Sequence, residues 1–87
     1  MIHKYELTMD ARQELILPAD AEILSVQNQR DRPVMWAIHK PGEKKEVRVI
    51  RVITTGNGYQ YPASLVYLNT VQFYDGSLVM HFFEELV

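Results

Sequence analysis

The chain has 87 residues, enough for one domain, and it contains no cysteine, which excludes disulfide bonds and thiolate chemistry. Hydrophobic residues make up 47% of the chain and charged residues 23%, which is typical of a globular protein. The net charge of −2 and the pI of about 5.8 exclude a strongly basic protein, and no apolar run approaches the ~20 residues that a membrane-spanning helix needs.

The N-terminus begins Met1-Ile2-His3-Lys4-Tyr5 and lacks the apolar stretch of a secretion signal. The sequence shows no internal repeat, low-complexity tract or linker. We therefore expect a soluble intracellular protein with a single all-β domain over residues 1–87.

Strand signals recur about every ten residues from the start of the chain, with turn residues between them. The first candidate strand covers residues 2–8, and Met9-Asp10-Ala11 is the expected turn. Residues 12–17 then return as the second strand, before Pro18-Ala19-Asp20 interrupts the pattern. This spacing predicts an antiparallel pair at the N-terminus.

Residues 22–39 are predicted to form a second hairpin around a polar loop. In the expected register Val26 faces Val34, and the next pair on the same side joins Leu24 to Trp36. Apolar cross-strand pairs of this kind stabilise a sheet.

The segment at residues 45–54 is the next predicted strand, and Pro41-Gly42 before it fits the central positions of a type II turn. If the turn folds this strand back on the preceding one, Val49 lies opposite Trp36. Trp36 would then occupy the central strand of a three-stranded meander, and we expect it in the core.

The clearest turn signal is Tyr74-Asp75-Gly76-Ser77, because Asp-Gly in a two-residue hairpin loop favours a type I′ turn. It predicts an antiparallel hairpin in which Phe73 faces Leu78 and Asn69 faces Phe82. Both faces of this hairpin carry apolar residues. We therefore expect the hairpin to lie centrally in a sheet or to form a homodimer interface.

These elements predict a small antiparallel β-sandwich or partly open barrel of six or seven strands in consecutive hairpins. The core is expected to come from the apolar residues that face inward in the registers above. They are Leu24, Val26, Val34, Trp36, Ile38, Val47, Val49, Leu68, Val71, Met80, Phe82 and Phe83.

Basic residues are concentrated in the middle of the chain, where residues 30–51 carry seven basic side chains and three acidic ones. One interpretation is a solvated hairpin whose lysines discourage edge-to-edge aggregation. The other is a nucleic-acid surface, because binding to phosphates requires several cations on one face. Its candidate residues are Arg30, Arg32, Lys44, Lys45, Arg48 and Arg51, although the acidic pI makes nucleic acid the less favoured partner.

The sequence offers little for catalysis. His3, His39 and His81 have no metal-ligand spacing, and we interpret them as three unrelated strand histidines. His81 would lie opposite Thr70, whose hydroxyl could bond the imidazole in a structural role. No serine lies in a nucleophile elbow and no glycine loop has the pattern of a phosphate-binding loop. We expect no catalytic residues, no metal and no cofactor.

Residues 55–64 form the longest irregular stretch, and Asn57, Tyr59 and Tyr61 within it are the candidate protein-binding residues. Tyrosines on a loop supply a large contact area at low entropic cost. The alternative is that the two tyrosines cover one end of the core.

The chain also resembles a family of small all-β proteins of unknown function found largely in bacteriophage and prophage genomes. The resemblance runs through nearly the whole length. It rests on Lys4-Tyr5-Glu6-Leu7, Pro18, Ala21-Glu22-Ile23-Leu24-Ser25-Val26-Gln27, Trp36-Ala37, Thr55-Gly56, Tyr67-Leu68, Thr70, Gly76, Leu78-Val79, His81 and Phe83-Glu84.

This resemblance implies a viral origin and a setting in the cytoplasm of the bacterial host, and it brings no catalytic residues. Small phage accessory proteins often bind and block a host protein, including CRISPR effectors. We therefore expect a non-enzymatic protein that binds a host or phage protein, with no membrane association. Nucleic-acid binding is the alternative.

Overall fold

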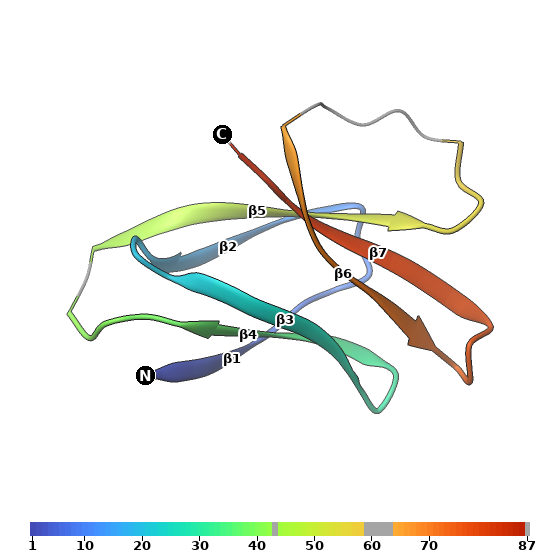
Figure 1. Ribbon diagram of the computed structural model, residues 1–87, viewed down its shortest axis with the longest axis horizontal. Coiled ribbons are helices and arrows are strands. Elements are labelled where there is room, and N and C mark those ends of the chain that lie inside the picture. Colours follow the sequence, from blue (N-terminus) through green and yellow to red (C-terminus); the bar gives the residue numbers. More distant parts are fainter. Residues whose placement is uncertain (43, 59–63, 87) are drawn as a thin grey trace.

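The computed structural model describes residues 1–42, 44–58 and 64–86. In these residues the chain forms seven strands and no helix, arranged as two antiparallel sheets around a shared core (Figure 1). One sheet has three strands in the order β1-β4-β3, and the other has four in the order β2-β5-β7-β6. The strands are β1 (Ile2–Glu6), β2 (Arg12–Pro18), β3 (Glu22–Gln29), β4 (Arg32–Ile38), β5 (Lys45–Thr54), β6 (Leu65–Phe73) and β7 (Leu78–Glu85).

The predicted all-β class with two antiparallel layers is confirmed, and the sheets do not close into a barrel. Of the described strands, only β3–β4 and β6–β7 are neighbours in both sequence and sheet. The prediction that the first two strands form an antiparallel pair is wrong, because β1 pairs with β4 and β2 pairs with β5. The backbone N–H of Leu7 bonds Pro33 in one layer, while the carbonyl of Ala11 bonds Val52 in the other. The short connection between β1 and β2 therefore crosses between the sheets.

The prediction of a three-stranded meander in the middle of the chain is also wrong. Gly42 has a φ of 83°, which fits the predicted type II turn. That turn carries the chain into the other sheet, where β5 lies between β2 and β7. Val49 therefore faces Glu14 and Glu85 and not Trp36.

The β6–β7 hairpin has the predicted register from Phe73 opposite Leu78 to Asn69 opposite Phe82, and a bulge at Leu68 then places Tyr67 opposite Phe83. The predicted turn is present: Ser77 donates its N–H to the carbonyl of Tyr74 at 3.1 Å, and the two residues between them, Asp75 and Gly76, have the positive φ values of a type I′ turn, 55° and 87°. Tyr74 also has a positive φ, of 51°, and an overlapping turn joins the N–H of Gly76 to the carbonyl of Phe73 at 3.1 Å.

The β3–β4 hairpin is shifted by one residue from the expected register, since Val26 lies opposite Met35. A bulge at Leu24 then changes the register again. Successive strand residues point to opposite faces, so the inward burial of Met35 and Ala37 turns Trp36 outward. The prediction that Trp36 is a core residue is therefore wrong.

The core contains six of the predicted residues, namely Val26, Val34, Val49, Val71, Met80 and Phe82, all of them buried. Three other residues that were predicted for the core have exposed side chains, so these predictions are wrong. They are Leu24, Ile38 and Val47. Trp36, Leu68 and Phe83 are only half-buried. The predictions missed several fully buried side chains, among them Leu17, Met35, Ile50 and Phe73.

Side-chain amides join the two sheets where β3 and β6 lie next to each other. Asn69 on β6 bonds both the N–H and the carbonyl of Val26 on β3. Asn28 on β3 donates from Nδ2 to the carbonyl of Gln72 on β6 at 2.8 Å. These bonds place the β3–β4 and β6–β7 turns at the same end of the molecule (Figure 1).

Candidate binding surface on the three-stranded sheet

The tip of the β3–β4 hairpin has an unusual backbone. Arg30 and Asp31 occupy its two loop positions with φ values of 54° and 61°, between the paired residues Gln29 and Arg32. A two-residue loop with both φ values positive is a type I′ turn, which favours Asn, Asp and Gly. An arginine in this conformation is uncommon and strained.

Hydrogen bonds brace this tip against the neighbouring turn. Asp31 accepts a bond at Oδ1 from the N–H of Tyr74 at 2.8 Å, and its own N–H donates to Oδ1 of Asn28 at 2.7 Å. Nδ2 of Asn28 also approaches Oδ1 of Asp31 at 3.4 Å. The Asp31 carboxylate thus bonds the backbone and a neutral amide, and it makes no ion pair with either arginine beside it.

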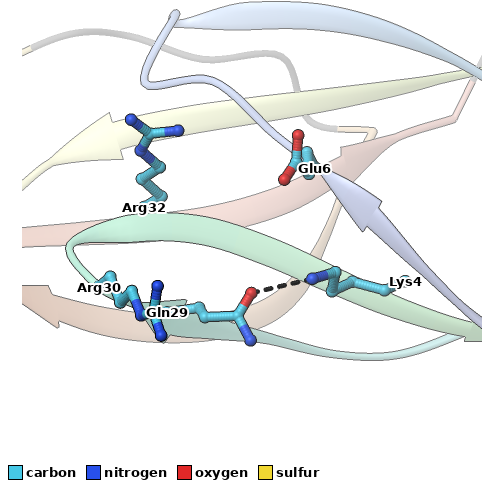
Figure 2. Close-up of a pocket in the computed structure, with 5 residues that line it drawn as sticks. All are labelled: Lys4, Glu6, Gln29, Arg30 and Arg32. Carbon is cyan, nitrogen blue, oxygen red and sulfur yellow. Dashed lines mark hydrogen bonds between the residues drawn. The ribbon is translucent and has the colours of Figure 1, made fainter.

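A depression of about 590 Å³ lies beside this tip on the outer face of the three-stranded sheet, the face turned away from the other sheet. Lys4 and Glu6 from β1 line it, together with Gln29, Arg30 and Arg32 from the hairpin (Figure 2). Lys4 donates from Nζ to Oε1 of Gln29 at 3.0 Å. The depression holds three cationic side chains and one carboxylate, so its local charge is positive.

Apolar side chains occupy the rest of this outer face. Trp36 on β4 lies between Lys4 and Ser25 on the neighbouring strands. Ile38, two residues along, faces Ile2, which is 59% exposed. Together with Leu24 at the bulge, which is 49% exposed, Trp36, Ile38 and Ile2 form what we call the Trp36 patch.

The structure separates the six basic residues proposed for nucleic-acid binding. Arg30 and Arg32 line the depression, whereas Lys45, Arg48 and Arg51 lie on β5 in the other sheet and Lys44 directly precedes it. The depression instead includes Lys4, which the sequence interpretation missed. No local signal marks Lys4, because only the pairing of β1 with β4 brings it there.

Two of these arginines are engaged in ion pairs within the four-stranded sheet. Arg48 bonds both carboxylate oxygens of Glu84 and donates from Nη1 to the carbonyl of Ala21 at 2.9 Å, with only 16% of its side chain exposed. The hydrogen bond to Glu84 raises the pKa of Arg48. Arg51 lies 3.7 Å from Glu85 and is similarly covered.

The candidate protein-binding loop is only partly described. Tyr59 and Tyr61 lie outside the described residues. Asn57 is exposed, and its N–H donates to the carbonyl of Thr54 at 3.1 Å across a turn that contains Gly56 at a φ of 87°. The assignment of this loop stays a prediction.

The expectation that the three histidines are unrelated is wrong for two of them. His3 and His39 meet with ring centroids 4.9 Å apart. His81 lies in the other sheet, where Nδ1 is 2.9 Å from the Thr70 hydroxyl, as predicted, and Nε2 is 2.6 Å from that of Thr55. Within residues 1–42, 44–58 and 64–86, no three His, Asp or Glu side chains gather as metal ligands would.

A domain of unknown function, DUF7352, matches residues 1–87 of the chain. The chain belongs to the DUF7352 family. Comparison with curated proteins finds no match, and comparison with solved structures finds none either. In the part of this DUF7352 chain that the structure describes, no helix is long and apolar enough to cross a membrane.

Proposed function

We propose that this DUF7352 protein is a non-enzymatic binding module that attaches to another protein through the outer face of its three-stranded sheet. The observation that carries the proposal is the position of Trp36, the single tryptophan of the chain, on that outer face and not in the core. Trp36 is not among the residues that pack against the hydrophobic core.

The composition of the face supports this function. Tryptophan and arginine are enriched among the residues that contribute most to protein–protein binding, and such residues are typically surrounded by less critical apolar contacts. Here the Trp36 patch adjoins the depression lined by Arg30 and Arg32. An exposed apolar patch bordered by charged residues is a common form of protein-binding surface.

We further propose that the partner is a host or phage protein in the cytoplasm of a bacterial host, and that binding blocks a defence complex such as a CRISPR effector. The support for this part is the resemblance to phage and prophage proteins carried by residues such as Trp36-Ala37 and Thr55-Gly56.

A homodimer is proposed on a separate surface, the outer face of the four-stranded sheet. Tyr67 is 57% exposed there and packs edge-on against Phe83, with ring centroids 5.6 Å apart. Ile53 and Val79 lie half-buried on the same side of neighbouring strands. This arrangement supports the expectation that the β6–β7 hairpin has more apolar surface than its own sheet covers.

Nucleic-acid binding remains the alternative proposal, with less support. The positive depression favours it, but the separation of the six basic residues over two sheets reduces the number of cations that one phosphate backbone could contact. The ion pairs of Arg48 and Arg51 reduce it further.

The proposed function is tested by affinity capture from bacterial lysate with the tagged full chain, followed by mass spectrometry. A partner should be retained by the wild type and lost with Trp36→Ser and with Leu24→Ser. Ile16→Ser is the matched control, since Ile16 is an exposed aliphatic residue on the other sheet. Identical protein sets on all four baits would reject the proposal.

The predicted loop is tested in the same experiment. If a partner is lost with Tyr59→Ala plus Tyr61→Ala but kept by Trp36→Ser, the binding surface is the loop at residues 55–64 and not the sheet. A partner lost with both sets would extend the surface from the sheet to the loop.

A further inference from the structure

We propose that the depression formed by Lys4, Arg30 and Arg32 binds the carboxylates of an acidic segment on the protein partner. This inference rests on the proposed function, because it names the chemistry that the partner presents beside the Trp36 patch. The three cations come from β1, from the hairpin tip and from β4, and they surround one open depression (Figure 2).

The two arginines are available to an external anion. Neither guanidinium takes part in a hydrogen bond or ion pair with another described residue. Asp31, the nearest acidic residue in sequence, is already bonded to the N–H of Tyr74. A guanidinium can bind a carboxylate through two parallel N–H···O bonds, which gives both affinity and orientation.

The backbone at the tip supports a role for the Arg30 side chain. Arg30 has a φ of 54° at a position where Asn or Gly would fit with less strain. Strained backbone positions of this kind occur often at ligand-binding sites, where the side chain contributes to function. The bonds from Asn28 and Asp31 hold the tip in place, so the Arg30 side chain projects from a fixed base.

Carboxylates of a protein fit this depression better than the phosphates of a nucleic acid. Glu6 lines it and repels any anion, but the backbone N–H groups of a peptide can donate hydrogen bonds to its carboxylate, which a phosphate backbone cannot do. The adjoining Trp36 patch offers apolar contacts that a protein surface can use.

The test is a titration of the isotope-labelled full chain with a hexaglutamate peptide, followed by NMR, with hexaglutamine as the uncharged control. Amide shifts should be confined to residues around Lys4, Glu6 and 29–32. The variant Arg30→Asn plus Arg32→Gln should bind hexaglutamate about tenfold more weakly, the loss expected for about two charge-assisted contacts.

A matched variant removes the same amount of charge elsewhere. Arg12→Gln plus Lys45→Gln eliminates two positive charges from the four-stranded sheet and should bind hexaglutamate like the wild type. Equal weakening by both double variants, or no binding of hexaglutamate at all, would overturn the inference. Tighter binding of an oligothymidylate than of hexaglutamate would overturn it in favour of nucleic acid.

The result is separable from the test of the proposed function. A captured partner that depends on Trp36 but is indifferent to Arg30→Asn plus Arg32→Gln would refute the acidic segment and leave protein binding intact. Localised hexaglutamate binding by a chain whose captured proteins do not depend on Trp36 would refute the proposed function alone.

Discussion

The side-chain amide of Asn69 bonds the backbone N–H and carbonyl of Val26, as a neighbouring strand would. Its side-chain oxygen accepts a hydrogen bond from the N–H of Val26 at 2.7 Å, and its side-chain nitrogen donates to the carbonyl of the same residue at 2.5 Å. Val26 is fully buried at the edge of the three-stranded sheet, so these backbone groups would otherwise lack a strand partner. One amide therefore satisfies both groups and joins the two layers.

Replacing Asn69 with Ala should lower the free energy of unfolding by about 2–6 kcal/mol, because two buried backbone groups lose their partners at about 1–3 kcal/mol each. Urea denaturation followed by circular dichroism measures this change. Asn57→Ala, at an exposed asparagine, is the control and should leave the midpoint unchanged. Equal midpoints for the two variants would show that water replaces the Asn69 amide at no cost.

Trp36→Ala should cost only about 1–2 kcal/mol and leave the domain folded, because the side chain is half-buried on an outer face. Phe82→Ala should cost about 3–5 kcal/mol, since Phe82 is fully buried in the core. Chemical denaturation followed by far-ultraviolet circular dichroism gives the ranking without the tryptophan signal. If Phe82→Ala does not fold, Phe82→Leu serves in its place. A greater loss of unfolding free energy with Trp36→Ala than with the Phe82 variant would contradict the outward position of the indole.

Arg48→Met should destabilise the domain by about 2–4 kcal/mol, because it leaves Glu84 and the carbonyl of Ala21 without their common donor in a largely covered site. A double-mutant cycle with Glu84→Met isolates the pair. The double variant should recover part of the loss, since no unpaired charge remains. Additive losses would mean that the pair contributes no coupling energy.

The Arg48 pair should be insensitive to rising pH. The pKa of Arg48 is raised by its bond to Glu84, so the stability it contributes is fully present below the unfolded pKa and is lost only as the pH rises through the higher folded value. The free-energy difference between wild type and Arg48→Met should stay constant from neutral to mildly alkaline pH. A difference that shrinks over that range would contradict the assignment.

Arg30→Asn should raise the free energy of unfolding by about 1 kcal/mol, because asparagine tolerates the left-handed backbone that strains arginine. Arg32→Gln removes the same charge from a strand position and should leave stability nearly unchanged. Thermal denaturation of the two variants measures the contrast. A loss of stability in Arg30→Asn would mean that the Arg30 side chain supports the fold.

The proposed homodimer should dissociate when a charge is placed on the outer face of the four-stranded sheet. Tyr67→Glu does this beside Phe83, whereas Tyr74→Glu alters an equally exposed tyrosine at the hairpin turn. Sedimentation velocity should show a dimer for the wild type and Tyr74→Glu, and a monomer for Tyr67→Glu. A wild type that stays monomeric at the highest concentration reached would reject the dimer.

Local patterns determined much of the fold. The alternation of apolar residues and the turn signals located all seven strands, and the Asp75-Gly76 signal led to the correct pairing of Phe73 with Leu78 because a short turn leaves few possible registers. The same patterns placed Arg30 and Arg32 close together and found the contact between His81 and Thr70.

Only the tertiary structure decided which distant strands pair. β1 and β4 are separated by two strands in the sequence, so nothing local brings Lys4 to Arg32 or sends β5 into the other sheet. The bulge at Leu24 and a shift of one residue in the β3–β4 register turned Met35 inward and Trp36 outward. Side chains alternate with a period of two along a strand, so a one-residue change in register exchanges the core face for the solvent face.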